Sequence, residues 1–178
     1  MQSARQMKTM NIVLNALFIA LVFVATLFLN IKLPIAANGG LVHLGSGMLF
    51  VITLLFGPKK GAVAGAFGMG LFDIVSGWAL WAPFTFVTRG AQAYVIGKIA
   101  WANGANGQHM GRNIFAMLVG LPVMLAGYYI CECILFKSFI IPFASMPGNL
   151  VQTAVGMIVA VPVVLALKKL SVIQTYQH

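Results

Sequence analysis

The chain has 178 residues, of which 61% are hydrophobic and 7% are charged, and its mean hydropathy is +0.97. This composition is typical of an integral membrane protein and excludes a soluble globular domain. The net charge is +9, and most of the basic residues lie at the ends of apolar runs. This placement argues against nucleic acid as a partner and indicates that the chain lies in a lipid bilayer.

Six apolar runs, separated by polar or Gly/Pro-containing breaks, predict an all-α integral membrane protein. A spanning helix takes about 20 apolar residues. The predicted spans cover residues 11–30, 43–57, 61–79, 84–102, 113–136 and 148–168. The second span is short and is expected to stand nearly upright or to be partly capped by protein. The short connections predict one compact bundle over residues 1–178.

The first run follows Arg5 and Lys8, as in a signal peptide, but it is too long for one and lacks a good cleavage site. We therefore expect an uncleaved first helix. Ala16 and Ala20 lie four residues apart on it and form a smooth stripe. Such a stripe serves either internal packing or the docking of a partner helix.

The third run is rich in glycine. Gly61, Gly65 and Gly68 share one side of a helix, and small residues let helices approach closely in lipid. A tight helix contact is favoured over a phosphate-binding loop, because no Gly-Lys-Ser/Thr ends the run.

Basic residues indicate the orientation of the chain. With the N-terminus inside, eight of them fall at cytoplasmic ends, and only Lys32 and Lys137 fall at outer loops. The eight are Arg5, Lys8, Lys59, Lys60, Lys98, Arg112, Lys168 and Lys169. The positive-inside rule then predicts that both termini are cytoplasmic.

Three ionisable residues, Asp73, Arg89 and Glu132, fall inside the apolar runs. A charge at bilayer depth costs about 2.5–3.5 kcal/mol on insertion scales, so such residues point to a functional site. The alternative is structural, because Asp73 and Arg89 can simply pair with each other.

With this topology, polar and aromatic residues from five helices and the first outer loop lie at one depth near the outer face. Together they predict a site with apolar walls and a few placed polar groups. The candidate ligand-binding residues are Asn38, His43, Asp73, Trp78, Trp81, Thr85, Arg89, Gln92, Tyr128, Glu132, Asn149 and Gln152, with Ser46 and Thr153 beside them.

Each of these residues also has an ordinary explanation. Trp78 and Trp81 can be interfacial belt residues. His43 can be a hydrogen-bonded interface histidine, and Tyr128 can be plain helix packing. The convergence of the set, rather than any single residue, favours a site that stacks and hydrogen-bonds a small planar ring.

Catalytic motifs are missing from the sequence, and Cys131 and Cys133 point to different faces of a helix. We therefore expect no enzymatic activity, no cofactor and no metal. A proton-coupled secondary transporter that uses Asp73 or Glu132 is the alternative to a binding subunit, and a non-transporting assembly protein is a third reading.

Several segments resemble the substrate-binding S components of energy-coupling factor (ECF) vitamin transporters. They are the turn at residues 57–62, the Gly/Ala-rich helix, Asp73, the 78–86 stretch and residues 88–90. The resemblance implies a six-helix protein that docks on one transmembrane coupling protein (T component) and two cytoplasmic ATPases.

The resemblance also implies particular roles and a location. The Ala16–Ala20 face would contact the coupling protein, and residues 32–42 would gate the site. The chain looks most like the hydroxymethylpyrimidine or vitamin B6 branch and is related to riboflavin S components, although relatives often carry lysine where Arg89 stands. We therefore expect a subunit of the bacterial cell membrane that captures such a vitamin outside, with riboflavin the less favoured substrate.

Overall fold

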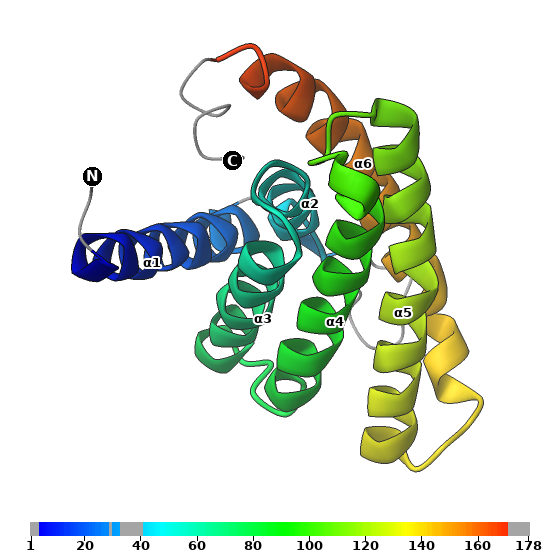
Figure 1. The fold of residues 1–178 in the computed structure, drawn as a ribbon. Helices are drawn as coiled ribbons and strands as arrows, with labels where there is room; N and C mark the ends of the chain where they lie inside the picture. Colours follow the sequence, from blue (N-terminus) through cyan, green and yellow to red (C-terminus); the bar gives the residue numbers. More distant parts are fainter. Residues whose placement is uncertain (1–3, 29, 33–40, 171–178) are drawn as a thin grey trace.

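A computed structural model describes residues 4–28, 30–32 and 41–170, and it confirms the all-α class. Its six α-helices lie close to the six predicted spans (Figure 1). They are α1 (Ala4–Phe28), α2 (Gly45–Phe56), α3 (Pro58–Val75), α4 (Ala82–Ala100), α5 (Met110–Phe136) and α6 (Met146–Leu167), with two short 3-10 helices at Ala102–Gly104 and Ile141–Ala144.

Turn chemistry sets several helix ends. Gly57 has a φ of 88°, a conformation that L side chains rarely adopt, and Pro58 follows it at the start of α3. Lys137 ends α5 in the left-handed conformation. The first helix begins at Ala4, earlier than the predicted residue 11, because the polar residues before the apolar run continue its helical turns.

The break between α1 and α2 adds a feature that the sequence analysis did not predict. Strand β1 (Asn30–Lys32) pairs antiparallel with β2 (Leu41–His43), and Asn30 lies opposite His43. The expected gating loop is therefore partly a hairpin. Its residues 33–40, including Asn38, lie outside the described residues.

The short helix α2 occupies the centre of the bundle. Ten of its residues are buried, and it packs against α1, α3, α4 and α6. This burial fits the expectation that the second span would be capped by protein, since a helix enclosed by others needs less length of its own.

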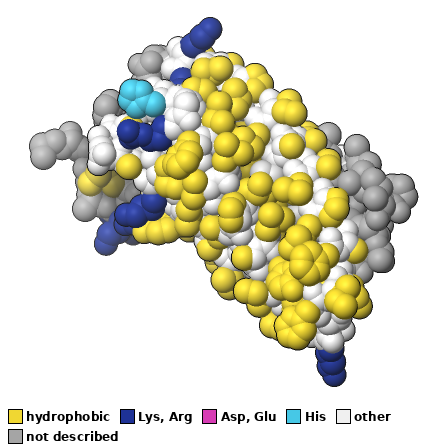
Figure 2. Space-filling model, turned by 90° about the vertical axis from the view of Figure 1, so that its right-hand side faces the viewer, with side chains coloured by type: hydrophobic (Ala, Val, Ile, Leu, Met, Phe, Trp, Pro, Cys, Tyr) yellow, Lys and Arg dark blue, Asp and Glu magenta, His cyan; other side chains and the backbone are white. Residues whose placement is uncertain are grey.

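The three longest helices, α1, α5 and α6, are strongly apolar. By length and composition, α1, α5 and the segment Ile141–Leu167 qualify as membrane-spanning, whereas α3 and α4 do not reach the same hydropathy. Figure 2 shows hydrophobic side chains over the face seen from the α5 side, with Lys and Arg gathered towards its ends. In Figure 1, α1 runs across the direction of α3, α4 and α5, and its N-terminal half extends beyond them.

The glycines of α3 form tight helix contacts, as predicted. A Cβ atom on Gly61 would lie 2.2 Å from Thr53 Oγ1 of α2, and one on Gly68 would lie 2.6 Å from Val22 Cβ of α1. Gly65 faces Leu49 of α2. The three glycines therefore let α3 approach two different helices.

One end of the bundle is held by the loop between α4 and α5. Trp101 Nε1 donates to the Leu54 carbonyl of α2 at 3.2 Å, and the indole packs on Gly57. The Gly107 carbonyl accepts from Asn113 Nδ2 at 2.7 Å and also from Lys168 Nζ. We call these contacts the inner clasp, because the predicted topology places them on the cytoplasmic side.

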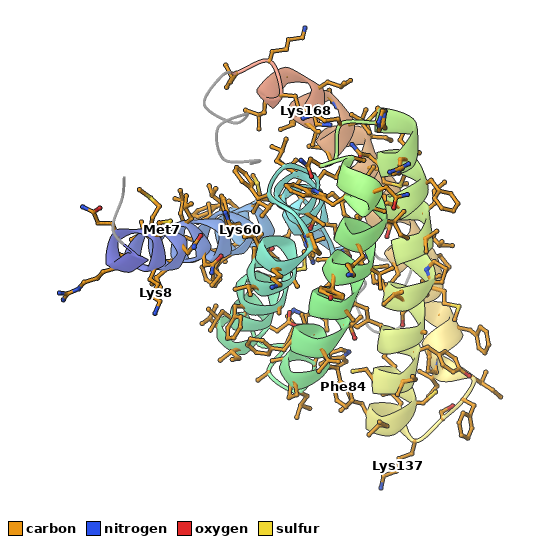
Figure 3. All side chains as sticks on the ribbon, viewed as in Figure 1. Met7, Lys8, Lys60, Phe84, Lys137 and Lys168 are labelled. Carbon is orange, nitrogen blue, oxygen red and sulfur yellow. The ribbon has the colours of Figure 1, made fainter. Side chains whose placement is uncertain are left out.

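The opposite end contains the link between α3 and α4 and the end of α5. Trp81 packs on Phe136 with ring centroids 6.0 Å apart. Phe84 and Lys137 lie at this end in Figure 3, and Lys168 lies at the other. The loops thus group as the predicted topology requires, while the side of the membrane on which each group lies stays a prediction.

Thiol labelling tests the orientation. Cysteines introduced at Lys59 and Lys137, both of which are exposed, should react differently with a membrane-impermeant maleimide added to intact cells. Position 137 should be labelled, and position 59 should be labelled only after the cells are opened. The parent chain, with its own thiols at Cys131 and Cys133, gives the background. Labelling of position 59 from outside would reverse the orientation.

Candidate ligand-binding site

Arg89 of α4 is the centre of a polar network inside the bundle, and it is only 2% exposed. Its NH1 group lies 3.3 Å from Ser46 Oγ of α2 and 3.0 Å from Gln92 Oε1. The same NH1 lies 2.9 Å from Met124 Sδ of α5. Its Nε donates to the Tyr128 hydroxyl at 3.1 Å, and the guanidinium lies 5.1 Å from the centre of that ring, a cation–π distance. One side chain therefore joins three helices.

Gln152 extends this network to α6 and to the hairpin. Its Nε2 donates to Ser46 Oγ at 2.8 Å and lies 3.2 Å from His43 Nε2 of β2. All three residues are buried. The strand that precedes α2 is thus tied directly to the interior polar groups.

Thr85 and Asp73 continue the network towards the end of α3. Thr85 Oγ1 shares a 3.2 Å hydrogen bond with the Tyr128 hydroxyl. Asp73 is partly exposed and close enough to interact with Thr85 and with the charge of Arg89. We use the term polar network for His43, Ser46, Thr85, Arg89, Gln92, Tyr128 and Gln152.

The hydrogen bonds given above for Arg89 all end on neutral groups. Asp73 adds a carboxylate beside this network, close enough to interact with both Thr85 and Arg89.

Other candidate residues lie apart from this network. Glu132 of α5 is buried and accepts a hydrogen bond from Ser145, just before α6. Trp78 and Trp81 pack edge-to-face on each other, with centroids 5.2 Å apart. The Asn149 carbonyl in the first turns of α6 accepts from Thr153 Oγ1 at 3.0 Å. The described contacts of these residues are with protein groups near the predicted outer end.

Close contacts between helices determine where the polar network lies. A Cβ atom on Gly127 of α5 would lie 2.3 Å from Thr88 Oγ1 of α4, next to Arg89 and Tyr128. A Cβ atom on Gly156 of α6 would lie 3.1 Å from both the Gly47 nitrogen and Ser46 Cβ. Glycines thus bring α5 and α6 near enough for their polar side chains to reach α4 and α2.

Sequence reasoning missed Met124. Its sulfur is near both Arg89 NH1 and Thr153 Oγ1, the latter at 3.7 Å. The only signal in the sequence was its position four residues before Tyr128 on the same helix face. A methionine in an apolar run is otherwise indistinguishable from ordinary core.

The arrangement can bind a ligand but offers little for covalent chemistry. Arg89 and Gln92 supply donors, Tyr128 supplies a ring and a hydroxyl, and apolar residues surround them. Within the described ranges, no group of three His, Cys, Asp or Glu side chains could hold a metal ion.

Comparisons with known proteins give the family. Residues 6–169 match the family described as ECF-type riboflavin transporter, S component. A protein of Pyrococcus woesei, described as an uncharacterized protein in gap 3'region, is 31% identical over 106 residues, which make up 60% of this chain and 68% of that protein. A solved S component of a bacterial ECF transporter matches with a TM-score of 0.68, over 91% of this chain and 97% of that chain, at 17% identity.

The structural likeness shows the fold, and the family match spans nearly all of the described helices. It confirms the resemblance at the level of the family and favours a binding subunit over a self-sufficient carrier or an assembly protein. The chain therefore belongs to the S components of ECF-type riboflavin transporters, the membrane-embedded, substrate-binding and non-enzymatic subunits of these transporters.

Proposed function

We propose that this S component captures a small planar vitamin or vitamin precursor at the extracellular face and delivers it inward with an ATPase module. The observation that carries this proposal is the polar network around Arg89. A buried arginine that links α2, α4 and α5 is costly in a bundle this apolar, and function is the usual reason for retaining it.

The ligand we propose is a nitrogen-containing ring that is mostly uncharged. The network supplies the Arg89 guanidinium, several neutral donors and acceptors and one aromatic face, which suit the edge and plane of such a ring. Hydroxymethylpyrimidine and vitamin B6 compounds remain the favoured substrates from the sequence, and the description of the matching family adds riboflavin as an equal candidate.

The direct test is to purify the chain in detergent, denature it and identify the released small molecule by mass spectrometry. Titration with hydroxymethylpyrimidine, pyridoxine and riboflavin, followed through tryptophan fluorescence, gives an independent measurement. One of these compounds should bind in a 1:1 ratio. The proposed function fails if none of them binds and no small molecule is released.

For partners, we propose docking on a transmembrane coupling protein that is joined to two cytoplasmic ATPases. The docking face would include Ala16 and Ala20. Both alanines are exposed on α1, which buries Phe18, Val22 and Thr26 on its other side. A partner helix could therefore approach the alanine stripe without displacing a neighbour within this chain.

Bulky substitutions test this face. Ala16→Trp or Ala20→Trp should block assembly with the coupling protein, because the larger side chain fills the groove between the helices. Ligand binding by the isolated subunit should survive, since the polar network lies elsewhere. Co-purification of the complex and ligand titration measure the two effects separately.

Ala154→Trp is the matched control, because Ala154 is an exposed alanine on α6. This variant should assemble normally. Normal assembly and transport by the Ala16 and Ala20 variants would show that the stripe is not the docking face.

A further inference from the structure

The two ends of the Gln92 amide have different surroundings. Gln92 is 0% exposed and lies in α4 close to Arg89. Arg89 NH1 donates to its Oε1 at 3.0 Å, whereas its Nε2 has no hydrogen-bond partner within the chain as described. A guanidinium can only donate, so the amide oxygen must be the end that faces Arg89. The orientation of the amide is therefore fixed.

An amide nitrogen buried without an acceptor is unfavourable and uncommon in folded proteins. The stem of Gln92 lies against α5, where a Cβ atom on Gly120 would be 3.5 Å from Gln92 Cγ. The stem of Gln92 is thus held between α4 and α5, and its amide oxygen is held by Arg89. Its Nε2 group has no acceptor among the described residues, which leaves its donors for a group that is not part of the chain.

Arg89 also makes this amide a stronger donor. A positive group that donates to the amide oxygen draws electron density from the nitrogen, and hydrogen bonds in a chain reinforce one another at low dielectric. The described hydrogen bonds of Arg89 itself go to protein groups on α2, α4 and α5. Its contacts therefore suit a role in positioning and polarising.

We propose that Gln92 Nε2 is the donor that recognises the substrate, and that Arg89 positions and polarises it. The substrate class is then a heterocycle with a carbonyl oxygen or an unprotonated ring nitrogen on its inward edge. A ring that presents an N–H group or an amine there would be rejected, because two donors would face each other. This inference rests on the proposed function and specifies its ligand.

Gln92→Glu separates recognition from positioning. The glutamate keeps an oxygen facing Arg89 but replaces the amide nitrogen with a second oxygen, which repels a ligand acceptor. Affinity for whichever of riboflavin, hydroxymethylpyrimidine and pyridoxine binds the parent chain should fall about 100-fold, and thermal stability should hold. Parental affinity in this variant would overturn the inference, because Gln92 would then serve only to hold Arg89.

Gln92→Leu provides a second measurement that adds no charge. It should weaken binding of the same compound about tenfold, through loss of the donor without added repulsion. Parental affinity in this variant would also overturn the inference. The outcomes remain distinguishable from failure of the proposed function, in which the parent chain binds none of the three compounds.

Discussion

Replacing Arg89 with methionine is expected to weaken ligand binding about 100-fold while changing the melting temperature little. The affinity should fall because Gln92 and Ser46 lose the group that orients them. A hydrogen bond from a charged group contributes about 1.5–3 kcal/mol, and about 1.4 kcal/mol corresponds to a factor of ten.

Two opposing terms keep the stability of this variant nearly unchanged. Removing a charge from bilayer depth relieves about 2.5–3.5 kcal/mol. Leaving Gln92 Oε1 without its donor costs about 1–3 kcal/mol. The Tyr128 hydroxyl still has Thr85, and Ser46 still has Gln152. Ligand titration and thermal unfolding of the same preparation measure both quantities.

Arg112→Met is the matched control for this substitution. Arg112 is half-buried beside the inner clasp, and its NH1 donates to the Ala102 carbonyl at 2.8 Å. Its loss should leave affinity unchanged. Full affinity in the Arg89 variant would show that the polar network is not part of the binding site. Equal losses of affinity in both variants would indicate a general effect of removing an arginine.

Replacing Gly97 with alanine should produce the largest loss of stability among the glycine contacts of α4. A Cβ atom there would lie 2.4 Å from Pro58 Cα and 2.7 Å from Pro58 N, so the start of α3 would have to move. Overpacking of this kind costs about 1–3 kcal/mol and sometimes more. A decrease in melting temperature of about 5 °C is expected for a chain of this size.

The buried thiol of Cys131 gives the readout for this prediction, since it should react with a maleimide dye only on unfolding. A Cys133→Ser background removes the partly exposed thiol. Gly111→Ala is the control, because a Cβ atom at this exposed position in the first turns of α5 would meet nothing within 4 Å. It should be neutral or slightly stabilising, as alanine favours helix. Equal stability of the two alanine variants would contradict the proposed contact.

Hydropathy and turn residues were enough to predict the six helices. Apolar runs of the right length are stable as helices in lipid, and Gly57-Pro58 marks the boundary between α2 and α3. The β1–β2 pairing was not predictable, since its strands have only three residues each and depend on tertiary support. The glycine contacts of α3 followed from spacing alone, although the partner of each glycine did not.

The residues of the site were easier to find than their arrangement. Arg89, Gln92 and Tyr128 were visible because polar groups are rare in apolar runs. Residue spacing could not show that Arg89 would donate to the Gln92 amide oxygen while the amide nitrogen has no acceptor. That arrangement depends on the distance and angle at which α4 and α5 pack. Trp78 and Trp81 were grouped with the site by depth, whereas their described contacts are with each other and with Phe136.

The modest hydropathy of α4 has a consequence for biosynthesis. Helix α5 is much more apolar than α4, and it also carries Tyr128 and Met124, two of the groups that contact Arg89. A nascent chain that has emerged only as far as α4 lacks these two groups of α5, although Ser46, Gln92 and Asp73 have already been synthesised. Insertion of α4 is therefore completed by the synthesis of α5, and a ribosome stalled between the two would leave the most costly side chain of the protein only partly compensated.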